Sequence, residues 1–82
     1  MTEEQLREAH THSAHNREEI ARSRQCGCFN CCTLFDASEV EAYIDGGETA
    51  MCPHCGIDSV IGDASVIALT QQFLRAMRRR WF

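Results

Sequence analysis

The sequence predicts a small α+β zinc-binding domain in which two CxxC knuckles are flanked by an N-terminal and a C-terminal helix. Three observations lead to this prediction: the length of the chain, its paired cysteines and a helical apolar pattern near its end. The apolar core of an 82-residue chain supplies only about 3–5 kcal/mol of stability, so a bound metal is a reasonable additional staple. A content of 44% hydrophobic and 24% charged residues is typical of a globular protein rather than of a disordered one.

Two cysteine pairs carry the strongest chemical signal. Cys28 and Cys31 form the first CxxC, Cys52 and Cys55 form the second, and twenty residues separate the pairs. This spacing matches a four-cysteine zinc site, because each turn brings two sulfurs to one ion at about 2.3 Å and tetrahedral Zn²⁺ needs two such turns. Gly56 suits the backbone just past the second pair, where φ is often positive. We therefore predict a structural Zn²⁺ site, although four thiolates also accept iron.

We divide the chain into an N-terminal helix over residues 1–24 and a zinc-binding core with a C-terminal helix over residues 25–82, together a single domain. The N-terminal stretch is rich in helix formers and its interior lacks Gly and Pro, but its apolar positions are sparse. His12 and His15 share a helical face, and His10 lies nearby. Because no third ligand is close in the sequence, we assign no second metal site to these histidines.

Between the knuckles we expect a strand over Thr33-Leu34-Phe35 and then a short helix. Ser38-Glu39-Val40-Glu41 has the Ser-x-x-Glu form of a capping box, and Gly46-Gly47 would end the helix. The segments ETAM and IDSVIGD on either side of the second pair have the character of strands. We expect them to form a hairpin joined through this knuckle.

The clearest predicted helix is TQQFLRAMRRRWF at the C-terminal end. Thr70 is placed to cap it, and its apolar stripe should pack on the zinc hairpin; the stripe consists of Phe73, Leu74, Met77 and Trp81. Arg75, Arg78 and Arg79 fall on the opposite face, where a solvated basic surface is favoured over a site for phosphate or for an acidic partner. The acidic N-terminal helix is expected near this helix, within the chain or between two protomers.

The segments CGCFNC, TAMCPHCGIDSVIGDAS and FLRAMRRRWF resemble a family of small bacterial proteins that are labelled as uncharacterised or cytoplasmic proteins. The resemblance extends from about His15 to Phe82 and implies a zinc-ribbon-like or treble-clef-like core without an established activity. It supports the same four cysteine ligands and adds Cys26 to the shared pattern. Cys32 stands where the family has an aliphatic residue, which fits a role in the core.

Three functions remain open, and the first is a non-catalytic, zinc-stabilised module for protein interaction or regulation. The second is a nucleic-acid-binding regulator that uses the C-terminal arginines, although a net charge of −4 opposes it. The third, a small metal-dependent hydrolase or nuclease-like enzyme, is the least favoured because no motif assigns catalytic roles. Its candidate residues are Asp58, Ser59, Asp63, His15, His54 and Cys26.

The sequence also indicates where the protein works. Acidic residues and the lack of an apolar stretch near the N-terminus argue against a secretory signal, and no run approaches the length of a membrane span. Six cysteines in a reducing compartment are better explained by metal binding than by disulfides. We expect a cytoplasmic protein whose partner is another protein, with a dimer as a further alternative.

Overall fold

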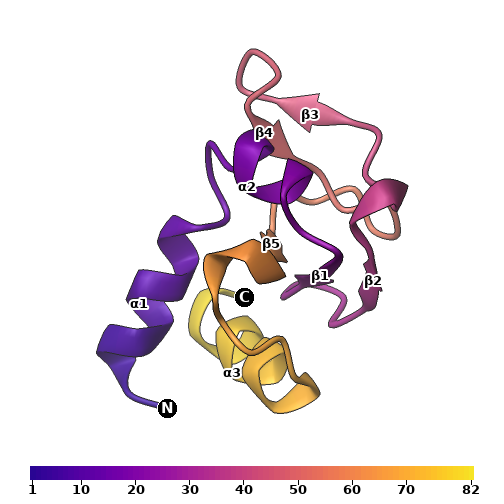
Figure 1. Ribbon diagram of the computed structural model, residues 1–82. Coiled ribbons are helices and arrows are strands. Elements are labelled where there is room, and N and C mark those ends of the chain that lie inside the picture. The colour runs from indigo at the N-terminus through magenta and orange to yellow at the C-terminus, as the bar shows by residue number, and fades with distance from the viewer.

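Two small antiparallel sheets and three helices make up the fold in the computed structural model, which describes residues 1–82 (Figure 1). The helices are α1 (Glu3–Thr11), α2 (Arg17–Ala21) and α3 (Gln71–Trp81). The strands are β1 (Gln25–Cys28), β2 (Leu34–Asp36), β3 (Tyr43–Ile44), β4 (Thr49–Ala50) and β5 (Val60–Gly62). The expectation of a small α+β domain is therefore confirmed. None of the helices combines the length and the apolar character that crossing a membrane requires.

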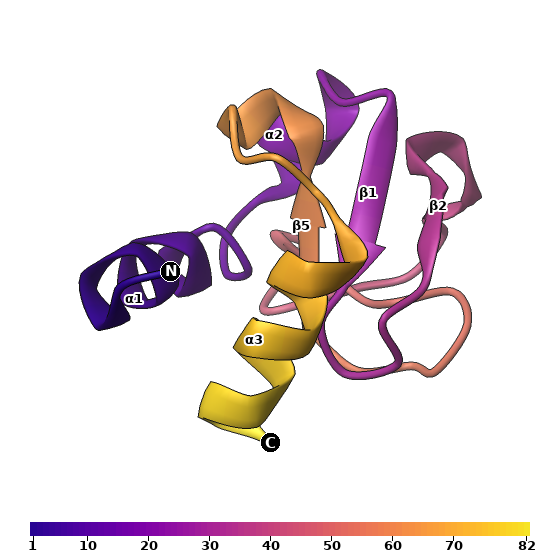
Figure 2. The same cartoon turned by 90° about the horizontal axis from the view of Figure 1, so that it is seen from below.

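The central strand β1 organises the larger sheet, whose order is β2-β1-β5 (Figure 2). Both neighbours are antiparallel to β1, so that Cys26 lies opposite Phe35 on one side and opposite Gly62 on the other. Successive side chains of a strand point to opposite faces. Cys26 and Cys28 therefore share one face of the sheet, and Gly27 occupies the other.

Each face of this sheet contributes to a separate apolar cluster. The first cluster combines side chains from α2, from both sheets and from three of the cysteines. Its buried members are Ile20, Cys26, Cys28, Phe35, Ala50, Cys52 and Val60. The second lies against α1 and α3; its buried members are Ala9, Phe29, Ile61, Phe73, Leu74 and Met77. At Gly27 a Cβ atom would lie 3.1 Å from a methyl group of Leu74, so this glycine allows α3 to approach the sheet closely.

The N-terminal segment forms two helices instead of the single helix expected over residues 1–24. Between α1 and α2 the buried Asn16 side chain donates to the Val60 carbonyl at 2.8 Å and accepts from the Ala50 backbone N–H at 3.0 Å. His15 has a positive φ of 49° at the same bend. These hydrogen bonds to both sheets are tertiary contacts, and they break a segment whose local propensity favours a continuous helix.

The expected helix between the knuckles was wrong. A capping box does form, but it pairs Asp36 with Glu39 and encloses a single 3₁₀ turn over Ala37–Glu39. The Ser38 backbone N–H and hydroxyl donate to the Asp36 carboxylate, which lowers the pKa of this carboxyl group. Beyond the turn Val40 is extended, and the chain continues into β3 rather than into a helix.

The predicted hairpin through the second knuckle was also wrong. Strands form near both expected positions, yet β4 pairs with β3 and β5 pairs with β1. The second knuckle therefore joins two different sheets. Strand pairing depends on contacts between distant parts of the chain, so the strand character of the two segments did not determine their partners.

The predicted C-terminal helix is confirmed as α3, with Thr70 as its cap. The Thr70 hydroxyl accepts from the Phe73 backbone N–H at 3.0 Å, and the apolar stripe is buried against α1 and the sheet rather than against a zinc hairpin. Trp81 is half-buried and stacks on His10 with 4.3 Å between the ring centroids. Glu3 accepts from Arg80 at 2.9 Å, so the acidic and the basic helix lie together within one chain.

Candidate metal centre

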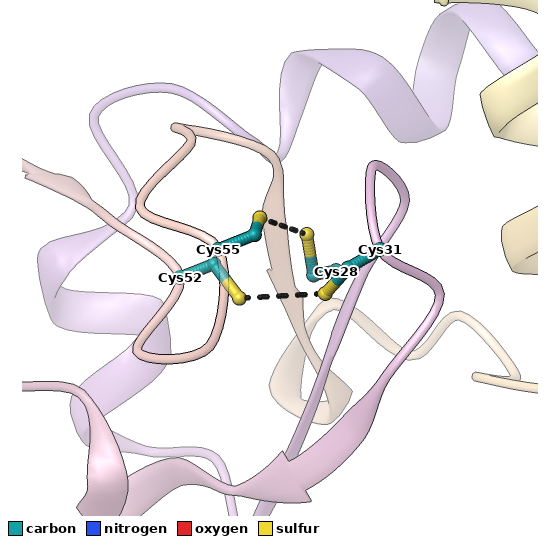
Figure 3. Close-up of side chains that lie close together, drawn as sticks. All are labelled: Cys28, Cys31, Cys52 and Cys55. Carbon is teal, nitrogen blue, oxygen red and sulfur yellow. Dashed lines mark hydrogen bonds between the residues drawn. The ribbon is translucent and has the colours of Figure 1, made fainter.

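Four sulfur atoms converge from the end of β1 with the turn after it and from the loop between β4 and β5. The side chains of Cys28, Cys31, Cys52 and Cys55 point toward one another, and their Sγ atoms all lie within 4.8 Å of each other (Figure 3). The Sγ atoms of Cys28 and Cys55 are 3.6 Å apart, and those of Cys31 and Cys52 are 3.8 Å apart. A tetrahedron with Zn–S bonds of about 2.3 Å has sulfur–sulfur edges of about 3.8 Å. Two of the six sulfur–sulfur distances thus match a tetrahedral edge, and the four thiols together could hold one metal ion.

Both pairs use the same kind of backbone turn. In the first knuckle, between β1 and β2, the Asn30 backbone N–H donates to Cys28 Sγ at 3.3 Å. In the second, the His54 backbone N–H donates to Cys52 Sγ at 3.3 Å. Such N–H donors favour the thiolate form of a cysteine, which is the form that binds metal. Each turn orients one sulfur and stabilises its negative charge.

The residue after each pair has a positive φ, 57° at Cys32 and 78° at Gly56. The expectation for Gly56 is confirmed. Cys32 is the equivalent residue of the first knuckle, where it is half-buried at the edge of the second apolar cluster, and its carbonyl accepts from Gln71 Nε2 at 3.0 Å. Cys32 therefore contributes through its backbone as well as through its side chain, whereas the sequence predicted only a role in the core.

Polar side chains around the sulfurs were not predicted as part of the site. Ser59 Oγ lies 3.0 Å from Cys28 Sγ, Asn30 Nδ2 donates to Cys55 Sγ at 3.4 Å, and Cys31 Sγ donates to the Thr33 hydroxyl at 3.3 Å. These contacts depend on χ angles and on packing across the two loops. The sequence shows only that polar residues lie inside or beside the CxxC turns, which does not predict which of them contact a sulfur.

Burial lowers the acidity of two of the clustered thiols, Cys28 and Cys52. It raises the pKa of Cys28 to about 12 and also raises the pKa of Cys52. Burial of Cys31 acts in the same direction, but hydrogen bonds with Thr33 and with the neighbouring thiols bring its pKa down to about 7. Metal binding must displace protons from the buried sulfurs, so the affinity of this site for a metal should fall in acid.

Cys26 is not part of the sulfur cluster. It is fully buried in β1 within the first apolar cluster. Burial, together with the negative charges of Asp63 and Asp36, raises the pKa of this thiol to about 12. A buried thiol that keeps its proton at neutral pH is a packing residue and a poor nucleophile.

The residues proposed for an enzyme do not form a common site. The Asp63 carboxylate accepts from the backbone N–H groups of Arg24 and Gln25 at 3.0 and 3.2 Å, where it fixes the start of β1. Ser59, at the other end of β5, contacts a cysteine of the cluster, and His54 Nε2 lies 3.2 Å from Glu39. Asp58 is exposed beside the second knuckle. This arrangement provides no nucleophile with an adjacent base.

The three predicted arginines lie on the exposed side of α3. Arg78 donates through Nη1 to the carbonyl of Asn30 in the first knuckle. Arg75 and Arg79 are exposed and line a groove that also includes Leu6 of α1. The basic surface and the sulfur cluster are therefore separate features that are linked through α3.

Comparisons with models of known protein families, with curated proteins and with solved structures returned no match to this chain. Statements about its function therefore depend on its own residues.

Proposed function

We propose that this chain is a non-catalytic interaction or regulatory module whose fold is stabilised by one Zn²⁺ ion. The observation that carries the proposal is the convergence of four thiols, two of whose sulfur–sulfur distances match a tetrahedral edge. Four protein ligands fill the coordination sphere, whereas catalytic zinc sites keep one position for water or substrate. Zinc would thus supply folding free energy and leave the surface free to bind a partner.

The architecture supports a ribbon-like description of the core more than a treble-clef-like one. The first cysteine pair starts at the last residue of β1, the second lies in the loop between β4 and β5, and no helix supplies a ligand. Six cysteines without a disulfide suit a reducing compartment, so we place the module in the cytoplasm. We also propose that the chain is related to the small bacterial proteins whose motifs it resembles.

Metal content provides the direct test. The purified chain should carry one zinc per molecule by elemental analysis and native mass spectrometry. Replacing Cys28, Cys31, Cys52 or Cys55 singly by Ser should lower this content and destabilise the fold, because one ligand is lost and buried thiols remain uncompensated.

The matched control variants are Cys26→Ala and Cys32→Ala, which remove thiols outside the cluster and should retain one zinc per chain. The proposal fails if either control loses the metal, or if a Cys-to-Ser change within the cluster keeps full zinc content. An iron-loaded, coloured protein would retain the ligand assignment but overturn zinc as the metal.

A further inference from the structure

A groove of about 700 Å³ separates the start of α1 from the outer face of α3. Its apolar part consists of Leu6 and Ala76, both half-buried, with the exposed Met1 at its edge. Arg75 and Arg79 line the α3 side. Leu6 belongs to α1 and Ala76 to α3, and these two helices contact each other in the lower part of Figure 1.

Three arginines line this groove, and two of them, Arg75 and Arg79, have no acidic partner in the chain. Among the four arginines of α3, only Arg80 forms an ion pair, with Glu3. Arg75 and Arg79 are one helical turn apart, where like charges are mutually unfavourable. The helix dipole favours Arg78, Arg79 and Arg80 in the last turn, but its effect does not extend to Arg75. Neither an ion pair nor the helix dipole therefore stabilises the charge of Arg75.

The acidic residues outside α3 disfavour a long polyanion more than a short acidic segment. Residues 25–74 contain no lysine or arginine and seven acidic residues: Asp36, Glu39, Glu41, Asp45, Glu48, Asp58 and Asp63. A bound Zn²⁺ with four thiolates would add further negative charge. A long nucleic acid would meet repulsion beyond α3, whereas a short acidic segment confined to the groove would not.

We propose that the α1–α3 groove binds an acidic amphipathic helix of a partner protein. An apolar side chain of that helix lies between Leu6 and Ala76, and two carboxylates one turn apart pair with Arg75 and Arg79. This is the helix-in-groove mode of recognition, with charge pairs at the rim. The inference rests on the proposed function, because it names the class of partner that the module binds.

The test uses the zinc-loaded chain and a defined probe. The probe is a fluorescein-labelled helical peptide of 16 residues that carries glutamates at i and i+4 beside a leucine stripe, and its twin has glutamine in place of every glutamate. Fluorescence anisotropy at low salt should show that the acidic peptide binds about tenfold more tightly than its twin, as expected for two exposed charge pairs. Raising the salt concentration should reduce this difference.

Two double variants locate the site. Arg75→Gln with Arg79→Gln should weaken binding of the acidic peptide about tenfold, while Arg22→Gln with Arg24→Gln, which removes the same charge from the region around α2 and β1, should leave it within about twofold. All four arginines are exposed, so both variants should fold and keep their zinc. Zinc content and circular dichroism confirm this before binding is measured.

Three results would overturn the proposal: equal binding of the two peptides, equal effects of the two double variants, or tighter binding of a 20-base-pair DNA duplex than of the acidic peptide. A fourth contrary result would come from sedimentation velocity: a wild-type dimer that becomes a monomer when Arg75→Gln and Arg79→Gln are combined. The groove would then bind a second copy of this chain instead of a partner protein. A chain that holds one zinc but binds no peptide refutes this groove assignment alone. Normal folding without metal refutes the proposed zinc-stabilised module instead.

Discussion

Single residues determine how the cysteine knuckles are built. Cys32 and Gly56 occupy equivalent positions with a positive φ, but only the glycine reaches this conformation without a Cβ penalty. The Cys32 carbonyl accepts from Gln71, and Arg78 donates to the carbonyl of Asn30, so both bonds attach the first knuckle to α3. The first knuckle is therefore held partly by side chains of a distant helix.

Cys26 should make the protein sensitive to alkali. Its pKa is raised to about 12 in the folded chain from 9.0 for an unperturbed thiol, mainly by burial. A folded pKa above the unfolded one contributes stability below pH 9.0, and this contribution is lost as the pH rises toward 12. Between pH 8 and pH 10, the free energy of unfolding should fall by about 1 kcal/mol more in the wild type than in Cys26→Ala.

Urea denaturation of the zinc-loaded proteins at the two pH values measures this difference. Cys32→Ala, which leaves Cys26 in place, serves as the control and should retain the wild-type dependence on pH. Identical alkaline losses in the wild type and in Cys26→Ala would contradict the assignment of Cys26 as a buried, protonated packing residue.

At the scale of elements, the close approach of α2 to β5 depends on Gly62. A Cβ atom at this position would lie 2.2 Å from Ser23 Oγ and 2.9 Å from Ser23 Cβ. Ser23 Oγ donates to the Glu19 carbonyl at 2.7 Å and accepts from the Ala64 backbone N–H at 3.0 Å. The serine thus links the end of α2 to the turn after β5 and cannot move without breaking these bonds.

Gly62→Ala should therefore lower the free energy of unfolding by about 1–3 kcal/mol, the usual range for overpacking. The backbone of Gly62, with φ −93° and ψ 156°, suits any residue, so the effect is steric. Gly27→Ala is the comparison, because its Cβ would meet only flexible leucine methyl groups at 3.1 Å or more. Urea denaturation should show the larger loss for Gly62→Ala, and the reverse order would contradict this account of the α2–β5 contact.

The elements that were predicted correctly are those with local signals. The helix α3 combines a capping threonine with an apolar stripe of helical period, and both signals lie within its own residues. Two overlapping capping-box patterns begin at Asp36 and at Ser38. Only the first forms, because Val40 is extended and leads into β3 instead of continuing a helix. The N-terminal segment divides at Asn16 for a similar reason, since its side chain bonds to both sheets.

In the molecule as a whole, the candidate metal site and the first apolar cluster share residues. The first apolar cluster contains two of the four clustered cysteines, Cys28 and Cys52, among its buried members, and the other two pack against it. Without a metal these four sulfurs would be drawn together by nothing stronger than weak thiol contacts. Loss of the metal should therefore loosen the whole cluster rather than a loop.

Chelation tests this coupling. Removing Zn²⁺ with a strong chelator should abolish the cooperative unfolding transition and most protection of backbone amides in β1 and β5, because metal binding supplies folding free energy in small domains. Circular dichroism with hydrogen exchange measures both effects, and adding Zn²⁺ back should restore them. A metal-free chain that keeps its cooperative transition would show that the apolar clusters alone suffice.

The grouping of cysteines into two knuckles and the helix α3 could be predicted from the sequence, because turn spacing and helical period are properties of neighbouring residues. The sequence also determined the separation of charge, with arginines in α3 and acidic residues in the preceding fifty positions, 25–74. The tertiary structure alone decided the partners of β4 and β5, the break at Asn16 and the groove beside Arg75. These features arise from contacts between residues far apart in the chain, and no local pattern encodes which distant segment will supply the partner.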